Sequence, residues 1–163
     1  MLITDISTTE CREILARNGF GRLGCARHNQ PYVVPFYFAY QPDHLYGYST
    51  PGRKIEWMRE NPKVCVEVDE VSSHFVWISV ILEGRFQELT DTPEFARERA
   101  NAQMLLEKRM LWWQIASATG ELQNLGEEAK PIFYRIQIDS ITGHRALPDV
   151  IDTQYSRFIE LEE

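Results

Sequence analysis

The chain has 163 residues, and its 17 basic and 24 acidic side chains give a formal charge of −7. A net acidic chain lacks the basic field that nucleic-acid binding normally requires, and no apolar run approaches the roughly 18 residues of a membrane span. The first residues show no secretory signal, and the three widely spaced cysteines are typical of free thiols in a reducing cytoplasm. We therefore expect one cytoplasmic domain over residues 1–163, with a frayed acidic end.

A short amphipathic helix is predicted near the N-terminus. Ser7 and Glu10 have the spacing of a capping box, in which Ser7 accepts from the amide three residues on and Glu10 reaches back. Three apolar residues then recur at helical spacing, and Asn18-Gly19 ends the helix; they are Cys11, Ile14 and Leu15.

Six later segments have the composition or alternation of β-strands. They are residues 21–27, 31–40, 45–48, 63–69, 75–89 and 132–138. Val64, Val66 and Val68 alternate as in a half-buried strand, and Gly84 predicts a bulge or a corner in the longest segment. The first four segments follow one another with short connections, so we expect a meander in an antiparallel barrel, mainly β with flanking helices.

Two further helices are expected. One takes Thr50 as its N-cap and Pro51 as its first residue, buries Ile55 and Met58, and ends at Asn61-Pro62.

The other begins at Thr92-Pro93-Glu94, runs through Trp112-Trp113 and ends near Gly120. Proline suits the first helical position, and the tryptophan pair is typical of a helix packed on a barrel.

Residues 19–24 spell G-x-G-x-x-G, the fingerprint of a dinucleotide-binding turn. That motif works only when a strand precedes it and a helix follows it, because the pyrophosphate meets the helix N-terminus. Here the order is reversed. We interpret these glycines as a helix stop and a tight entry into a strand.

The strongest functional signal is the pair Arg53 and Lys54, in the first turn of the predicted second helix. Free amides and the helix dipole favour anions there and disfavour basic residues. Two cations in this position therefore predict a bound anion, with phosphate as the best match; the alternative is two solvated surface charges. Nearby aromatic residues suit either a flat heteroaromatic ligand or plain core: Phe36, Tyr37, Phe38, Tyr40, Tyr46, Tyr48, Trp57 and Trp77.

The histidines show no metal-ligand spacing with another His, Cys or carboxylate, so no metal site is predicted. His28 and His44 fit surface turns. His74 is predicted to open the longest strand and to face a ligand cleft, which makes it a weak catalytic candidate.

Several blocks resemble the pyridoxamine-phosphate-oxidase-like, FMN-binding split-barrel superfamily, over about residues 8–146. The resemblance is nearest to the subgroup that includes the nitroimidazole-resistance proteins. The matching blocks, in chain order, are residues 21–24, 31–36, 52–54 followed by 61–62, 64–69, 79–85, and 134–136 leading to 142–143.

The resemblance implies a six-stranded antiparallel split barrel and a homodimer with two FMN sites at the subunit interface. It implies that Arg53 and Lys54 hold the flavin phosphate and that Ser79 is a polar flavin contact. The strand over residues 31–40 would lay its backbone against the isoalloxazine at Val33, Val34, Pro35 and Phe36. The ribityl-phosphate region would be contacted by Tyr48 and Ser49. The oxidase's basic C-terminal substrate motif has no clear counterpart, which argues against oxidation of pyridoxamine phosphate.

The expected function is that of a small FMN-dependent oxidoreductase with an unidentified electron donor and acceptor. The cofactor would carry the redox chemistry, so no side-chain nucleophile is needed; His74 and Trp113 are the polar-tipped residues expected near the ring. The alternatives are a non-catalytic carrier or sensor of flavin or haem, and a structural dimer with a vestigial site. The sequence does not separate FMN from a deazaflavin or haem.

Overall fold

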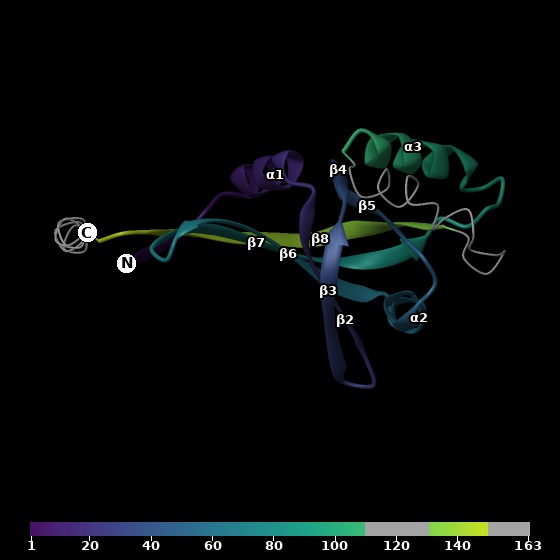
Figure 1. The fold of residues 1–163 in the computed structure, drawn as a ribbon, viewed down its shortest axis with the longest axis horizontal. Coiled ribbons are helices and arrows are strands. Elements are labelled where there is room, and N and C mark those ends of the chain that lie inside the picture. Colours follow the sequence, from purple (N-terminus) through teal and green to yellow (C-terminus); the bar gives the residue numbers. More distant parts are fainter. Residues whose placement is uncertain (110–130, 150–163) are drawn as a thin grey trace, which may run out of the picture.

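The computed structural model describes residues 1–109 and 131–149 (Figure 1). Within these ranges it has eight strands and three helices, in the order β1 (Leu2–Asp5), α1 (Thr8–Arg17), β2 (Phe20–Arg27), β3 (Gln30–Tyr37), β4 (Ala39–Gln41), β5 (His44–Ser49), α2 (Arg53–Glu60), β6 (Lys63–Ser73), β7 (Val76–Glu88), α3 (Ala96–Glu107) and β8 (Ile132–Leu147). Helix α3 begins later than Thr92-Pro93. The predicted passage through Trp112-Trp113 to Gly120 lies outside the described residues.

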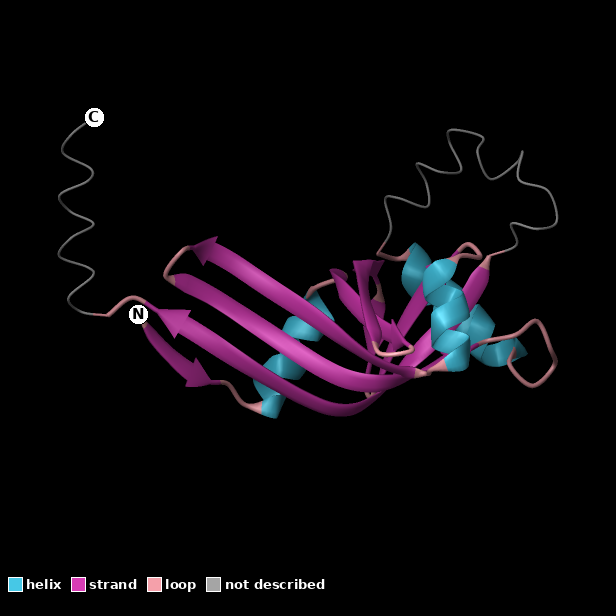
Figure 2. Cartoon of the chain, turned by 90° about the horizontal axis from the view of Figure 1, so that it is seen from below, coloured by secondary structure: helices cyan, strands magenta, loops and turns pink. Residues whose placement is uncertain are grey.

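The strands form a single antiparallel sheet with the order β3-β2-β6-β7-β8-β5-β4, and β1 pairs with β8. The two ends of this path, β3 and β4, are nearly continuous in the chain, since only Phe38 separates them. The sheet therefore curls back on itself without closing, which gives the split barrel that was expected. Figure 2 shows the long strands of this sheet curving together beyond the helices.

The predicted meander is wrong. Strands β2 and β3 form a hairpin, as do β4 and β5, but β5 then pairs with β8 while β6 returns to pair with β2. The segment 31–40 is divided at Phe38, between the end of β3 and the start of β4, although the Phe38 amide still donates to the Gly19 carbonyl at 2.9 Å in the β2–β3 register. Strand β1 was not expected, and β8 continues nine residues beyond Ile138.

The core lies on the inner face of the curved sheet. Val64, Val66 and Val68 are buried there as predicted, together with Leu82 of β7. The register of β7 against β8 shifts between Glu83 and Gly84, as expected for a bulge here, but the extra residue is Asp139 on β8, opposite Gly84. A Cβ atom at Gly84 would lie 2.3 Å from the Gln137 carbonyl oxygen, so this close approach requires glycine.

Helix α1 is confirmed at both ends and covers the inner face with Cys11, Ile14 and Leu15. The Ser7 hydroxyl accepts from the Glu10 amide at 3.2 Å, which is half of the capping box. The Glu10 carboxylate does not reach back to the cap, because it forms an ion pair with Arg145 of β8 instead. The predicted local contact is thus replaced by one that ties α1 to the sheet.

Tyr134 of β8 has its whole side chain inside the barrel, stacked on Phe36 at a centroid distance of 6.0 Å. Its hydroxyl has no hydrogen-bond partner among residues 1–109 and 131–149, and burial raises the pKa of this phenol. A buried hydroxyl without a partner costs free energy that a same-shaped apolar ring does not.

We expect Tyr134→Phe to raise the free energy of unfolding by about 1–3 kcal/mol, measured by urea denaturation. Tyr40→Phe is the matched control, because the Tyr40 hydroxyl is hydrogen-bonded to Arg12 and its removal brings no such gain. A loss of stability in Tyr134→Phe would show that this hydroxyl is satisfied in solution.

Candidate functional site

Helix α2 follows β5 after a three-residue loop and begins two residues later than predicted. The Gly52 carbonyl accepts the amides of Ile55 and Glu56 at 3.0 and 3.1 Å, so Gly52 occupies the N-cap position expected for Thr50. No side chain caps this end of the helix. Burial of Ile55 and Met58 and the end at Asn61 are as predicted.

Arg53 and Lys54 are therefore the first two residues of α2. Because no side chain caps the helix and the Gly52 carbonyl takes the amides of Ile55 and Glu56, the amides of Arg53 and Lys54 themselves have no capping oxygen. Neither cation forms an ion pair with any acidic residue that the structure describes. Two unpaired cations beside free amides make a site suited to an anion such as a phosphate.

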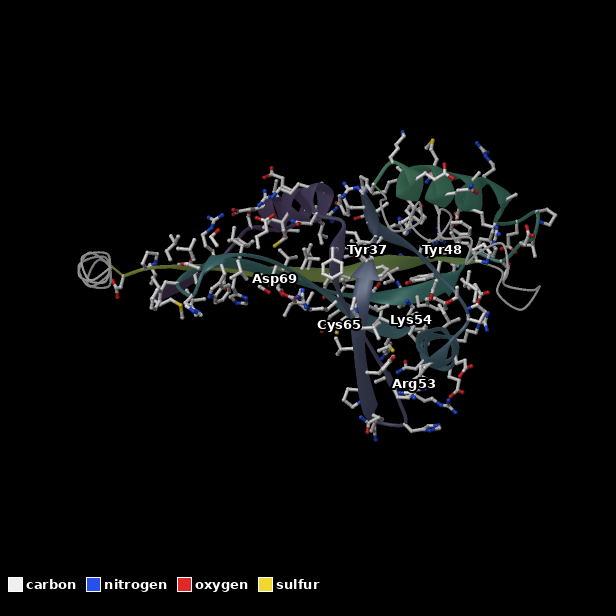
Figure 3. All side chains as sticks on the ribbon, in the orientation of Figure 1. Tyr37, Tyr48, Arg53, Lys54, Cys65 and Asp69 are labelled. Carbon is white, nitrogen blue, oxygen red and sulfur yellow. The ribbon has the colours of Figure 1, made fainter. Side chains whose placement is uncertain are left out.

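The two cations have different surroundings (Figure 3). Arg53 is exposed, and its guanidinium carbon lies 5.3 Å from the ring centroid of Tyr32 on β3. Lys54 is half-buried on the side of α2 that faces the sheet. Burial lowers the pKa of its amine, although the nearby Cys25 thiol acts in the opposite direction. Burial also raises the pKa of that thiol.

The strand proposed to face a flat ligand is β3, and its side chains alternate. Val33 and Pro35 point outward and are exposed, whereas Val34 and Phe36 face the core, with Phe36 only 2% exposed. Phe36 can therefore offer a ligand its backbone but not its ring.

Tyr48 and Ser49 end strand β5 and lead directly into the loop before Arg53. Both side chains are buried. The Tyr48 ring packs on Phe133 at 5.3 Å, and the Ser49 hydroxyl donates to the Thr50 carbonyl at 2.9 Å. These two residues are thus close to the α2 cations along the chain and fix the loop that joins strand to helix.

Ser79 is not brought to the α2 cations within one chain. Its hydroxyl donates to Glu67 at 3.1 Å on the outer face of the sheet, and its register partner is Asp69. Asp69 lies along the sheet, well away from Arg53 and Lys54 in Figure 3. Burial, with a smaller contribution from Asp69, raises the pKa of the Glu67 carboxyl.

His74 does not open β7, because the strand begins at Val76 and His74 lies exposed in the β6–β7 turn. This turn is at the opposite end of the molecule from α2 in Figure 1. The prediction that His74 opens the strand is therefore wrong, whereas its place beside a ligand cleft between subunits stays a prediction. Trp113 lies outside the described residues.

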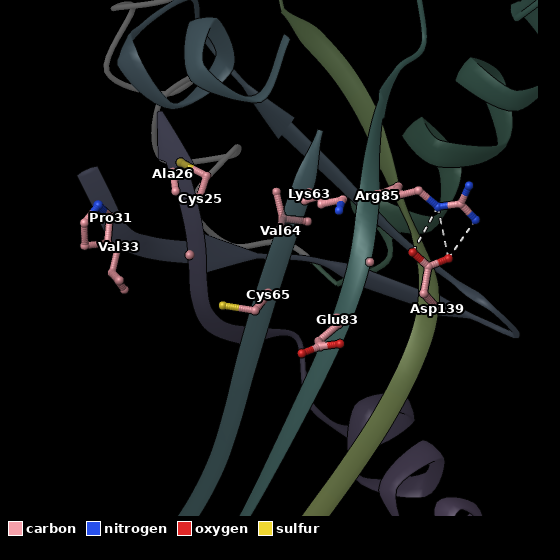
Figure 4. Close-up of a pocket in the computed structure, with 12 residues that line it drawn as sticks. Cys25, Ala26, Pro31, Val33, Lys63, Val64, Cys65, Glu83, Arg85 and Asp139 are labelled. Carbon is pink, nitrogen blue, oxygen red and sulfur yellow. Dashed lines mark hydrogen bonds and ion pairs between the residues drawn. The ribbon is translucent and has the colours of Figure 1, made fainter. Parts of the chain in front are cut away.

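A hollow of about 540 Å³ lies on the outer face of the sheet (Figure 4). Val33 is the predicted site residue that lines it. Its polar lining was not predicted, although the alternation opposite Val64 marks Lys63 and Cys65 as outward-facing. Arg85 and Asp139 form an ion pair at 2.7 Å in this lining. The polar side chains that line the hollow are Lys63, Cys65, Glu83, Arg85 and Asp139.

Two classes of feature are not found in the described ranges. Across residues 1–109 and 131–149, no three His, Cys, Asp or Glu side chains gather in a way that could hold a metal ion. Over the same part of the chain, no helix has the length and apolar character needed to cross a membrane.

Comparison with known proteins identifies the family. The family model for pyridoxamine 5'-phosphate oxidase matches residues 7–145. An uncharacterized protein of Rhizobium meliloti (strain 1021) is 38% identical, over 90% of this chain and 97% of its own. A FAD-binding protein from Mesorhizobium loti is 41% identical with a TM-score of 0.71, covering 90% of this chain and 99% of its own.

A Bacteroides thetaiotaomicron structure named for 5-nitroimidazole antibiotic resistance shares the fold. Its TM-score is 0.62 at 19% identity, over 89% of each chain. The split-barrel fold agrees with the family match over residues 7–145. The chain belongs to the pyridoxamine 5'-phosphate oxidase-like family of split-barrel proteins.

Proposed function

We propose that the chain binds a flavin nucleotide, with the phosphate held at the N-terminus of α2, and acts as a small flavin-dependent oxidoreductase. The observation that carries this proposal is the pair Arg53 and Lys54, two cations without an acidic partner in the described structure, at a helix end that no side chain caps. The name of the Mesorhizobium loti relative, a FAD-binding protein at 41% identity, supports it.

FMN was the cofactor expected from the sequence, whereas that relative is named for FAD. Both nucleotides contain riboflavin 5'-phosphate, so the α2 cations suit either one. We propose FMN as the smaller ligand that fills this site, and a comparison of the two nucleotides tests the choice.

A bound flavin would supply the hydride or electron transfer, and the protein would bind and orient it. Arg53, Lys54 and the first amides of α2 would hold the phosphate. The exposed backbone edge of β3 at Val33 and Pro35 would lie against the ring system. His74 is remote from these residues within one chain, so a catalytic role for it would depend on a second copy.

We further propose a homodimer in the cytoplasm. The outer face of the sheet exposes large apolar side chains, including Val33 at 64% and Val71 at 65%, and a two-fold related copy would cover them. A second copy could also supply residues such as Ser79 to its partner's flavin site. The free cysteines Cys11, Cys25 and Cys65 suit a reducing compartment.

The test uses freshly purified protein in four measurements. We expect a flavin absorbance spectrum, a sedimentation mass of about two chains at micromolar concentration, and bleaching of the flavin band by NADH or NADPH faster than for free FMN. Reoxidation by a quinone or nitroaromatic should restore the band. A haem Soret band, or a flavin that neither nicotinamide reduces and that passes electrons to no acceptor, would favour a carrier instead.

A further inference from the structure

Arg53 is held by an aromatic ring rather than by a carboxylate. Its guanidinium carbon lies 5.3 Å from the centroid of Tyr32. No acidic residue in the described part of the chain forms an ion pair with it, although Arg17, Arg59 and Arg85 each have such a partner. The contact between Arg53 and Tyr32 is thus the interaction that places this exposed side chain.

Helix α2 contacts the Tyr32 ring with two side chains. Arg53 and Trp57 are four positions apart, so they project from the same face of the helix. The Trp57 ring lies 5.5 Å from that of Tyr32, tilted by 57°. Both rings are partly buried and pack against the main core, so the surface beneath Arg53 is fixed.

A cation–π contact holds the guanidinium over a ring face, which has neither the acceptor oxygens nor the negative charge of a carboxylate. A carboxylate in the same position would occupy the guanidinium N–H donors and neutralise the charge. Tyr32 therefore orders a flexible side chain without competing with an anion. Ordering before binding removes part of the entropy cost that the ligand would otherwise meet.

We propose that Tyr32 is a positioning residue: its ring holds Arg53 ready for the ligand phosphate and so gives the site its preference for phosphorylated over unphosphorylated flavin. This inference rests on the proposed function, and it assigns the preference to a strand residue that need not touch the ligand.

The test compares FMN with riboflavin, which lacks the phosphate, in fluorescence titrations of four variants. Tyr32→Leu should weaken FMN binding by about three- to tenfold and leave riboflavin binding unchanged. Tyr32→Phe keeps the ring and should keep the preference for FMN. In an Arg53→Ala background, adding Tyr32→Leu should cause no further loss, because the residue that Tyr32 positions is gone.

Phe20→Leu is the matched control. It removes a similar contact at the other end of the same hairpin, where the Arg22 guanidinium lies 5.8 Å from the Phe20 ring. FMN binding should be unchanged in this variant. Should Tyr32→Leu fail to fold, pentafluorophenylalanine at position 32 preserves the ring's shape while reversing its quadrupole, and it should reproduce the selective loss.

The outcomes separate the two proposals. If the unmodified protein binds riboflavin as tightly as FMN, the phosphate site itself is wrong. If that protein prefers FMN and a folded Tyr32→Leu variant keeps the full preference, or loses both ligands equally, only the role of Tyr32 is overturned. Additive losses from Arg53→Ala and Tyr32→Leu would overturn it as well.

Discussion

Arg53→Ala should weaken FMN binding by about 1.5–3 kcal/mol, the value of a hydrogen bond to a charged group. This is roughly a ten- to hundredfold rise in Kd, and riboflavin affinity should hardly change because riboflavin has no phosphate. Added salt should weaken FMN binding to the unmodified protein more than to Arg53→Ala. Isothermal titration of both ligands at two salt concentrations measures these differences.

Arg59→Ala supplies the control from the same helix. Arg59 lies in the last turn of α2 and pairs with Glu88 at 2.7 Å, so it belongs to the helix-to-sheet contact and not to the uncapped end. Arg59→Ala removes the same type of side chain as Arg53→Ala, and flavin affinity should not change. Equal losses of FMN and riboflavin in Arg53→Ala would contradict the phosphate assignment.

Leu82→Ala should lower the free energy of unfolding by about 2–5 kcal/mol. Leu82 is completely buried on β7, between Val66 of β6 and Ile141 of β8. Removing its branched end leaves a cavity that two hydrogen-bonded neighbouring strands cannot close. Urea denaturation of the ligand-free protein gives the value directly.

Ile81→Ala is the matched comparison, one residue away on the opposite face of the same strand. Ile81 is 45% exposed, so the same kind of truncation should cost less than about 1 kcal/mol. Equal effects at the two positions would mean that the inner and outer faces of β7 have been misassigned.

Strands with one buried face could be predicted from the sequence. The period-two pattern of Val64, Val66 and Val68 marks β6 because burial on one face imposes it. Strand β1 has no buried residue, and its extended form comes from pairing with β8, so no local pattern reveals it. The strand order could not be predicted either, because the apolar face of β8 would suit any neighbour.

Part of the candidate site was also readable. Arg53 and Lys54 stand out because their charge opposes the helix dipole, and this conflict is visible without any structure. The helix start was misplaced because Thr50 and Pro51 are good start signals, yet the Gly52 carbonyl accepts the first helical amides.

The contribution of Tyr32 could not be read from the sequence. Its contact with Arg53 joins two elements that are distant in sequence, and a tyrosine within an aromatic strand has the appearance of ordinary core. The four-residue spacing of Arg53 and Trp57 was the available signal, since it places both side chains on one helix face.

Strand β8 pairs with β1, β5 and β7. Of these partners, β1 and β5 are synthesised long before β8. A nascent chain on the ribosome therefore cannot complete the barrel until residues 132–147 have emerged. Until then the hydrogen-bonding edges of β5 and β7 remain open to pairing with other chains. High contact order of this kind slows folding, and truncation before Ile132 would leave those edges permanently exposed.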